Sequence, residues 1–179
     1  MTPEQSLFFD ACRRGDLATV EQLYNADPSL VNITDVRGFT PLIIAVYNNE
    51  AAVTDFLLQK GAAFDAQDAS GNTAMMGAGF KGYIALIKRL LDAGADVNQR
   101  NFQGATALTF AATFGQLEIA ELLLQKGADL HVQDVRGKSP LAHAIIQENE
   151  AMIELLEKYQ APSISSNEGG NGGDELGII

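Results

Sequence analysis

A glycine-rich run is the first candidate for chemistry in this sequence. Residues 75–83 read MMGAGFKGY, and Gly77, Gly79 and Gly82 match the G-x-G-x-x-G pattern that binds a dinucleotide pyrophosphate. That chemistry requires a strand before the first glycine and a helix after it, because the pyrophosphate lies at the helix N-terminus. The role of these glycines therefore depends on the elements around them.

Few other side chains could react or bind a metal. Cys12 is the single cysteine, which excludes an internal disulfide and a cysteine-based zinc cluster. The two histidines, His131 and His143, have no obvious carboxylate ligand set, and no G-x-S-x-G nucleophile motif occurs. We expect Cys12 to be a buried, unreactive side chain. The sequence thus predicts no enzyme, no metal and no cofactor.

The charge balance limits the classes of partner. The formal net charge is −11, from 12 basic and 23 acidic residues, so attraction of the whole molecule to nucleic acid or to anionic lipid is not expected. No run of about 18 apolar residues predicts a membrane span. The N-terminus lacks the pattern of a secretory signal peptide, and one cysteine suits a reducing compartment. We therefore expect a cytoplasmic protein.

The elements that must position these residues come from an internal repeat. Glycines recur every 33 residues in one phase, at Gly38, Gly71, Gly104 and Gly137. A hydroxyl residue follows two positions later in each unit, which predicts the N-cap of a helix, and these residues are Thr40, Thr73, Thr106 and Ser139. Pro41 and Pro140 then occupy the first helical position. A second apolar helix follows in each unit, for example in LEIAELLLQKG at 117–127.

The repeats predict an all-α solenoid with short β-hairpin-like turns, since a two-helix unit buries its apolar faces only against its neighbours. We place the repeat domain at residues 1–160, with a one-residue insertion near Asp27 in the first unit. The five repeats span about 5–37, 38–70, 71–103, 104–136 and 137–160. Residues 161–179 are rich in Gly, Ser and Asn and are predicted to be a flexible acidic tail.

The period, the Thr-Pro-Leu start in GFTPL and the GADVN and GADL ends resemble the ankyrin repeat over about residues 5–160. The histidine that follows Thr-Pro-Leu in that family is missing from all of the units. Its place is taken by Ile43, Met76, Thr109 and Ala142. The hydrogen bonds between repeats that this histidine makes are therefore expected to be absent or replaced.

When the glycine-rich run is aligned with the 33-residue repeat, it no longer fits a phosphate-binding loop. Gly77 and Gly79 fall inside the first helix of the third unit, and Gly82 is the glycine that ends it. Each glycine in a helix costs roughly 1 kcal/mol relative to alanine, so this helix is predicted to be a weak point of the fold. A close approach of a neighbouring backbone is one reason for a glycine at such a position.

The resemblance implies that a protein partner contacts the hairpin tips and the inner helices, which form a concave surface. At those positions this sequence has aromatic and basic residues but no acidic one, so we expect an aromatic, locally basic groove and an acidic back. The candidate partner-binding residues are Arg13, Arg14, Arg37, Phe39, Tyr47, Phe80, Lys81, Phe102, Phe114, Arg136 and Lys138.

The sequence thus favours a non-catalytic adaptor or regulator, monomeric, that binds a protein partner with acidic and apolar surface and binds neither nucleic acid nor membrane. Two alternatives stay open: a structural or designed scaffold without a natural ligand, and a regulatory subunit or effector that modulates an enzyme. A further hypothesis is that the tail, which ends in GGDELGII, docks in the groove.

Overall fold

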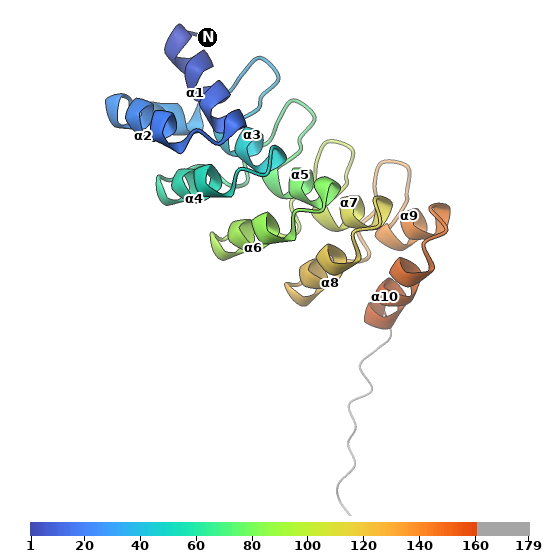
Figure 1. Cartoon of the computed structure of the whole chain (residues 1–179). Coiled ribbons are helices and arrows are strands. Elements are labelled where there is room, and N and C mark those ends of the chain that lie inside the picture. The colour runs from blue at the N-terminus through green and yellow to red at the C-terminus, as the bar shows by residue number, and fades with distance from the viewer. Residues whose placement is uncertain (161–179) are drawn as a thin grey trace, which may run out of the picture.

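Residues 1–160 are described by a computed structural model, and within them the chain forms two rows of α-helices without a strand (Figure 1). The helices are α1 (Pro3–Arg14), α2 (Leu17–Ala26), α3 (Pro41–Tyr47), α4 (Ala51–Gln59), α5 (Ala74–Lys81), α6 (Ile84–Asp92), α7 (Ala107–Thr113), α8 (Leu117–Gln125), α9 (Pro140–Ile146) and α10 (Glu150–Gln160). The all-α repeat fold predicted from the sequence is confirmed. The predicted tail and its docking lie outside the described residues.

The expected N-caps start the odd-numbered helices from α3 to α9. In α3, Thr40 Oγ1 accepts a bond from the Ile43 N–H at 3.2 Å, and Ser139 Oγ accepts from the Ala142 N–H at 3.2 Å in α9. These bonds satisfy backbone donors that a helix start leaves unpaired. After α3 and α9 the chain turns through left-handed residues that are not glycine, Asn49 at φ 63° and Glu148 at φ 54°.

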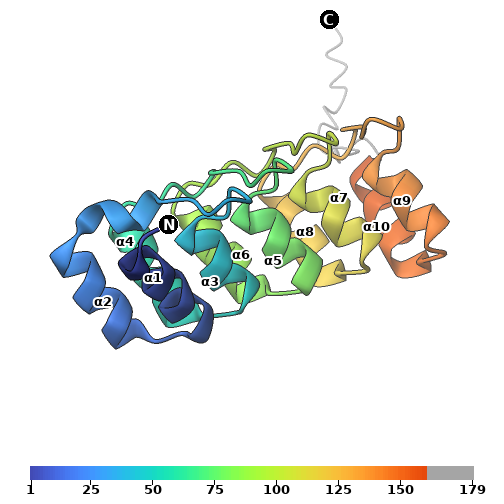
Figure 2. The same ribbon diagram turned by 90° about the horizontal axis from the view of Figure 1, so that it is seen from above.

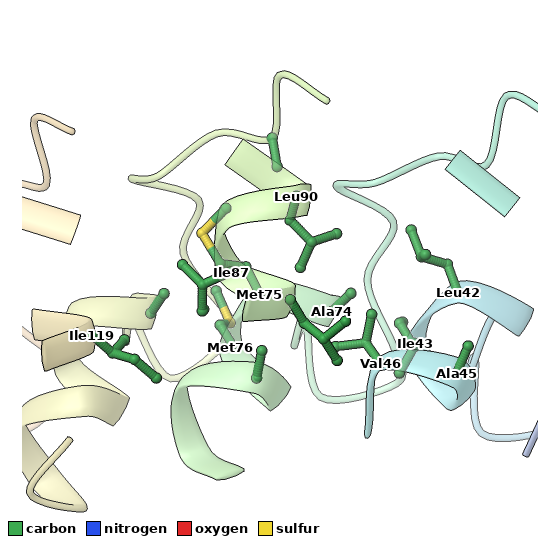
Figure 3. Close-up of a cluster of buried hydrophobic side chains, with 14 of the residues drawn as sticks. Leu42, Ile43, Ala45, Val46, Ala74, Met75, Met76, Ile87, Leu90 and Ile119 are labelled. Carbon is green, nitrogen blue, oxygen red and sulfur yellow. The ribbon is translucent and has the colours of Figure 1, made fainter. Parts of the chain in front are cut away.

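The helices form two layers that share one core. The odd-numbered helices lie side by side as an inner layer, the even-numbered ones cover one side of it, and the loops between repeats line one edge (Figure 2). Side chains from neighbouring repeats fill the space between the layers, among them Leu42 of α3, Met75 of α5 and Leu90 of α6 (Figure 3). Because every unit shares this core with the next, the inner helices are held at fixed spacing.

The first repeat contains the predicted extra residue. Helix α2 ends at Ala26, and a 3-10 helix (Pro28–Asn32) follows instead of the left-handed glycine used in the later units. Asp27 caps this turn, because its Oδ1 accepts from the Ser29 N–H at 3.0 Å. The insertion is thus absorbed before Asn32, and the hairpins that follow keep the common phase.

Backbone hydrogen bonds join each hairpin tip to the next. The Ala69 N–H donates to Arg37 O at 2.8 Å, Phe102 N–H to Ser70 O at 3.1 Å, and Val135 N–H to Gln103 O at 2.9 Å. Each hairpin is also closed internally by its Asp or Asn side chain. In the second hairpin, for example, Asp68 Oδ1 accepts from Ser70 N at 2.8 Å and from Asn72 N at 2.9 Å.

Side chains at another repeated position, that of Asn32 and Asn98, add hydrogen bonds between units. Asn32 donates to Gly61 O at 3.1 Å and accepts from Ala63 N at 2.8 Å, and Asn98 does the same with Gly127 O (3.1 Å) and Asp129 N (2.7 Å). These bonds connect the loops of successive units.

Asp65 occupies the same position between those asparagines, but a carboxylate cannot donate to Gly94 O. It only accepts from the Asp96 N–H, at 3.1 Å. Replacing Asp65 with Asn is expected to add the missing donor and to raise the free energy of unfolding by about 1 kcal/mol at pH 7. Chemical denaturation of the two proteins measures the difference.

The gain from Asp65→Asn should also depend on pH. Burial raises the pKa of Asp65 above its ordinary value of 3.8, and the Asp96 carboxylate raises it further against the opposing effect of the Asp96 N–H bond. A raised folded-state pKa means that the ionised carboxylate destabilises the fold above that pKa, and the penalty disappears as pH falls through it. The advantage of Asn should therefore shrink on acidification, and an advantage that grows in acid would contradict this assignment.

The two mid-helix glycines differ in their surroundings. A Cβ at Gly79 would lie 3.3 Å from Ala107 O, whereas a Cβ at Gly77 would meet only Tyr47 Cδ2, at 3.6 Å. The close approach considered from the sequence thus holds for Gly79, where α5 meets α7. At Gly77 no backbone stands in the way.

Gly77→Ala is therefore expected to raise the free energy of unfolding by about 0.5–1 kcal/mol, because alanine loses less conformational freedom in a helix. Gly79→Ala should gain less or nothing, since Ala107 O must give way. Urea unfolding of both variants tests the contrast, and equal stabilisation by the two would contradict it.

Candidate protein-binding groove

A groove of about 580 Å³ lies between the hairpins and the ends of the inner helices. Three consecutive inner helices supply its floor through Tyr47 of α3, Phe80 of α5 and Phe114, which follows α7. The hairpins supply Arg37, Phe39, Asp68 and Asn72 to one wall. The remaining lining residues are Arg13, Ile43, Ile44, Asn48, Thr73, Met76, Gly77 and Phe110.

The aromatic rings of the groove contact one another across repeats. Tyr47 and Phe80 stack with ring centroids 6.4 Å apart and planes 11° from parallel, and Phe80 meets Phe114 edge-to-face at 4.6 Å. Phe114 also stacks on Phe110 at 6.4 Å. Contact within the row does not bury it, because Tyr47 is still 44% exposed and Phe114 48% exposed. We refer to Tyr47, Phe80 and Phe114 as the aromatic row.

Two cationic side chains lie over aromatic rings that line the groove. Lys81 Nζ lies 4.5 Å from the centroid of Tyr47, and Arg37 Cζ lies 4.7 Å from the centroid of Phe39. Within residues 1–160, Lys81 has no carboxylate partner inside 4.0 Å, and Arg37 reaches Asp35 only at 3.9 Å. Both cations are thus positioned by aromatic faces and remain available to an anion.

One acidic residue also lines the groove, at a position that was not among those mapped from the sequence. Asp68 lines the groove, where its carboxylate accepts from Ser70 N and Asn72 N and from Asn72 Nδ2 at 3.3 Å. Arg13, also in the lining, forms a salt bridge with Asp10 on its own helix. The basic character of the groove is therefore concentrated at Arg37 and Lys81.

The structure brings together Arg13, Arg37, Phe39, Tyr47, Phe80 and Phe114 in the groove lining, with Lys81 over the rings. Four other candidates lie outside it. Arg14 is exposed at the end of α1, and Arg136 and Lys138 belong to the last hairpin. Phe102, 64% exposed, is at a hairpin tip beside Gly71.

Sequence reasoning missed Phe110, Met76 and Gly77 as groove residues. Gly77 and Phe110 occupy the same repeat position as Ile44 and His143. This position lies one helical turn before the inner-helix ends from which the candidate residues were chosen. Helical spacing puts residues four apart on one face, so Phe110 could have been found from its position relative to Phe114.

The other candidates for chemistry have structural roles in the described residues. Cys12 is buried, and burial raises the pKa of its thiol to about 12, which keeps it protonated and poorly nucleophilic. His143 Nε2 lies 2.9 Å from Asp134 Oδ2 inside the last repeat. The Lys138 N–H bond holds the pKa of Asp134 below its ordinary value, and His143 lowers it further. No group of three metal-binding side chains occurs in residues 1–160.

Comparison with known families decides the classification. A sequence profile of ankyrin repeats in three copies matches residues 8–101 and 78–167. The chain belongs to the ankyrin-repeat family. Ankyrin repeats generally bind protein partners and are generally not catalytic. None of the ankyrin helices in residues 1–160 is long and apolar enough to cross a membrane.

The ankyrin repeats of this chain are similar to part of a larger protein. An NAD-capped RNA hydrolase, NUDT12, of Pongo abelii is 35% identical over 63 residues. That match covers 34% of this chain and only 14% of the hydrolase, so the chain spans a small fraction of its relative. The similarity concerns these 63 residues alone.

Proposed function

We propose that this protein is a non-catalytic ankyrin-repeat adaptor or regulator that binds a protein partner through the groove. The observation that carries the proposal is the aromatic row, built from three consecutive repeats, in which Tyr47 and Phe114 are nearly half exposed and Phe80 is partly exposed beside Lys81. An aromatic surface of this kind is favourable to cover, at roughly 25 cal/mol per Å² of apolar area. Aromatic residues and Arg are also the side chains enriched in binding hot spots.

The charges of the groove favour a partner that carries carboxylates. The chain as a whole has a net charge of −11, yet Arg37 and Lys81 project over the groove rings. A nucleic acid would meet repulsion from most of the molecule, while an acidic and apolar protein segment would be attracted locally. We propose the cytoplasm as its location on the strength of the single buried cysteine.

A monomer is the oligomeric state we propose. Helix α10, the last in residues 1–160, presents Glu154, Glu157 and Lys158 as exposed residues, so its outer face is polar, although Ile145 and Ile146 of α9 are also exposed. Terminal repeats with a polar outer face stop further stacking.

Affinity capture from cell lysate tests the function. We would compare the full chain with a groove variant carrying Tyr47→Ala, Phe80→Ala and Phe114→Ala, and with a control, Leu117→Ala, on the outer helix α8 at 39% exposure. A protein retained by the wild type and the control but lost by the folded groove variant supports the proposal. The same proteins on all three baits, or none on any, would favour another surface or a scaffold without a ligand.

A further inference from the structure

One position in the lining of the groove, Gly77, has no side chain. At the phase of Gly77, the neighbouring repeats carry Ile44 and Phe110, and both of these line the groove on either side of it. A Cβ at Gly77 would make an ordinary contact of 3.6 Å with Tyr47, so that a larger side chain would extend into the groove volume. We call the space between Ile44, Gly77 and Phe110 the Gly77 pocket.

Several polar groups of the lining already have partners within the chain. Asn48 Nδ2 donates to Ile44 O at 2.8 Å, and Asn72 Oδ1 accepts from Asn101 Nδ2 at 2.8 Å. Asp68 is bonded to its own turn. The accessible apolar surface here comes from the partly exposed aromatic rings, since Met76 below them is buried, so the pocket favours an apolar group over a polar one.

The cations give the pocket its second preference. Arg37 and Lys81 each lie over a ring that lines the groove, Phe39 and Tyr47 respectively. Arg37 precedes α3 and Lys81 ends α5, so positive charge reaches the groove from two neighbouring parts of the stack. Carboxylates on either side of an apolar group in the pocket would form charge-assisted contacts there.

We propose that the Gly77 pocket binds one bulky apolar side chain, such as Phe, Leu or Met, of a partner peptide segment that carries Asp or Glu beside it. The inference rests on the proposed function and names the chemistry of the partner segment. The occupant is a peptide side chain because the pocket is open along the groove and its walls come from three successive repeats, which suits an extended chain.

The test is selection of a displayed random-peptide library on the full chain, followed by affinity measurement of the enriched peptides. We expect enrichment of a bulky apolar residue with Asp or Glu within two positions. Gly77→Leu fills the pocket and should weaken these peptides by about tenfold or more, whereas the control Leu117→Ala, on the outer helix α8, should leave their affinity within about twofold. Arg37→Gln should weaken them several-fold and reduce the preference for acidic neighbours.

A second variant covers the case in which Gly77→Leu does not fold. Phe80→Ala removes a partly exposed ring from the other side of the groove and should also cost about tenfold in peptide affinity. Lack of enrichment, enrichment of basic peptides, or enriched peptides that bind Gly77→Leu as tightly as the wild type would overturn the proposal. Suppose that a captured protein is lost by the aromatic-row variant but binds Gly77→Leu as it binds the wild type. That result would support the groove as the binding site and contradict only the pocket proposal.

Discussion

Replacing Gly71 with Ala is expected to lower the free energy of unfolding by about 2–4 kcal/mol. Gly71 has φ +80°, where alanine itself costs roughly 1–2 kcal/mol. In addition, its Cβ would lie 2.6 Å from Phe102 N, the atom that bonds to Ser70 O and joins the two hairpins. The substitution should therefore separate the second hairpin from the third. Urea unfolding of the full chain measures the loss.

Gly137 provides a matched control for Gly71. It holds the same place in the last hairpin at φ +74°, but a Cβ added there would have no heavy atom within 4 Å beyond its chain neighbours. Gly137→Ala should thus cost only the roughly 1–2 kcal/mol of the left-handed backbone. Equal losses for the two variants would mean that contact between hairpins does not contribute to stability.

Reversing the two groove cations is expected to have the largest effect on binding. In the double variant Arg37→Glu and Lys81→Glu, carboxylates replace the groups that lie over Phe39 and Tyr47. The affinity for a captured partner should fall by at least about tenfold, and the loss should be smaller at high salt, because screening weakens charge repulsion. Titration calorimetry at two salt concentrations gives both results.

The control for this variant makes the same change in net charge elsewhere. Lys88→Glu and Lys126→Glu change two exposed lysines, one on the outer helix α6 and one just after α8. This control should bind the partner within about threefold of the wild type, since long-range effects are screened beyond about 8–10 Å. A comparable loss in both variants would show that net charge, and not the groove cations, determines affinity.

Most of the fold was predictable because each repeat carries the same kinds of capping and apolar residues at the same positions. Thr40 and Ser139 could be assigned as caps from their type and place, and the structure shows their side chains accepting the expected N–H bonds. The one-residue insertion near Asp27 could be located from a shift in phase, although its 3-10 form could not. These features depend on neighbours close in the chain, which a single sequence contains.

The groove was predictable only in part. The position of a residue within the repeat indicates whether its side chain is exposed, but it does not indicate which other side chains it contacts. The aromatic row came from positions that stacking leaves uncovered. The salt bridge of Arg13 with Asp10 and the place of Asp68 in the lining depend on side-chain directions that spacing does not give. The meaning of Gly77 required knowing what surrounds it, since a helix glycine marks close contact at Gly79 and an open pocket at Gly77.

Hydrogen exchange of the full chain, with and without a captured partner, is the most direct test of the groove as the binding surface. We predict slower exchange on binding at the ends of the inner helices, around residues 44–48, 76–81 and 110–114, with little change in the outer helices α4, α6 and α8. Slower exchange confined to the outer helices, with the aromatic row unaffected, would contradict the groove as the binding surface.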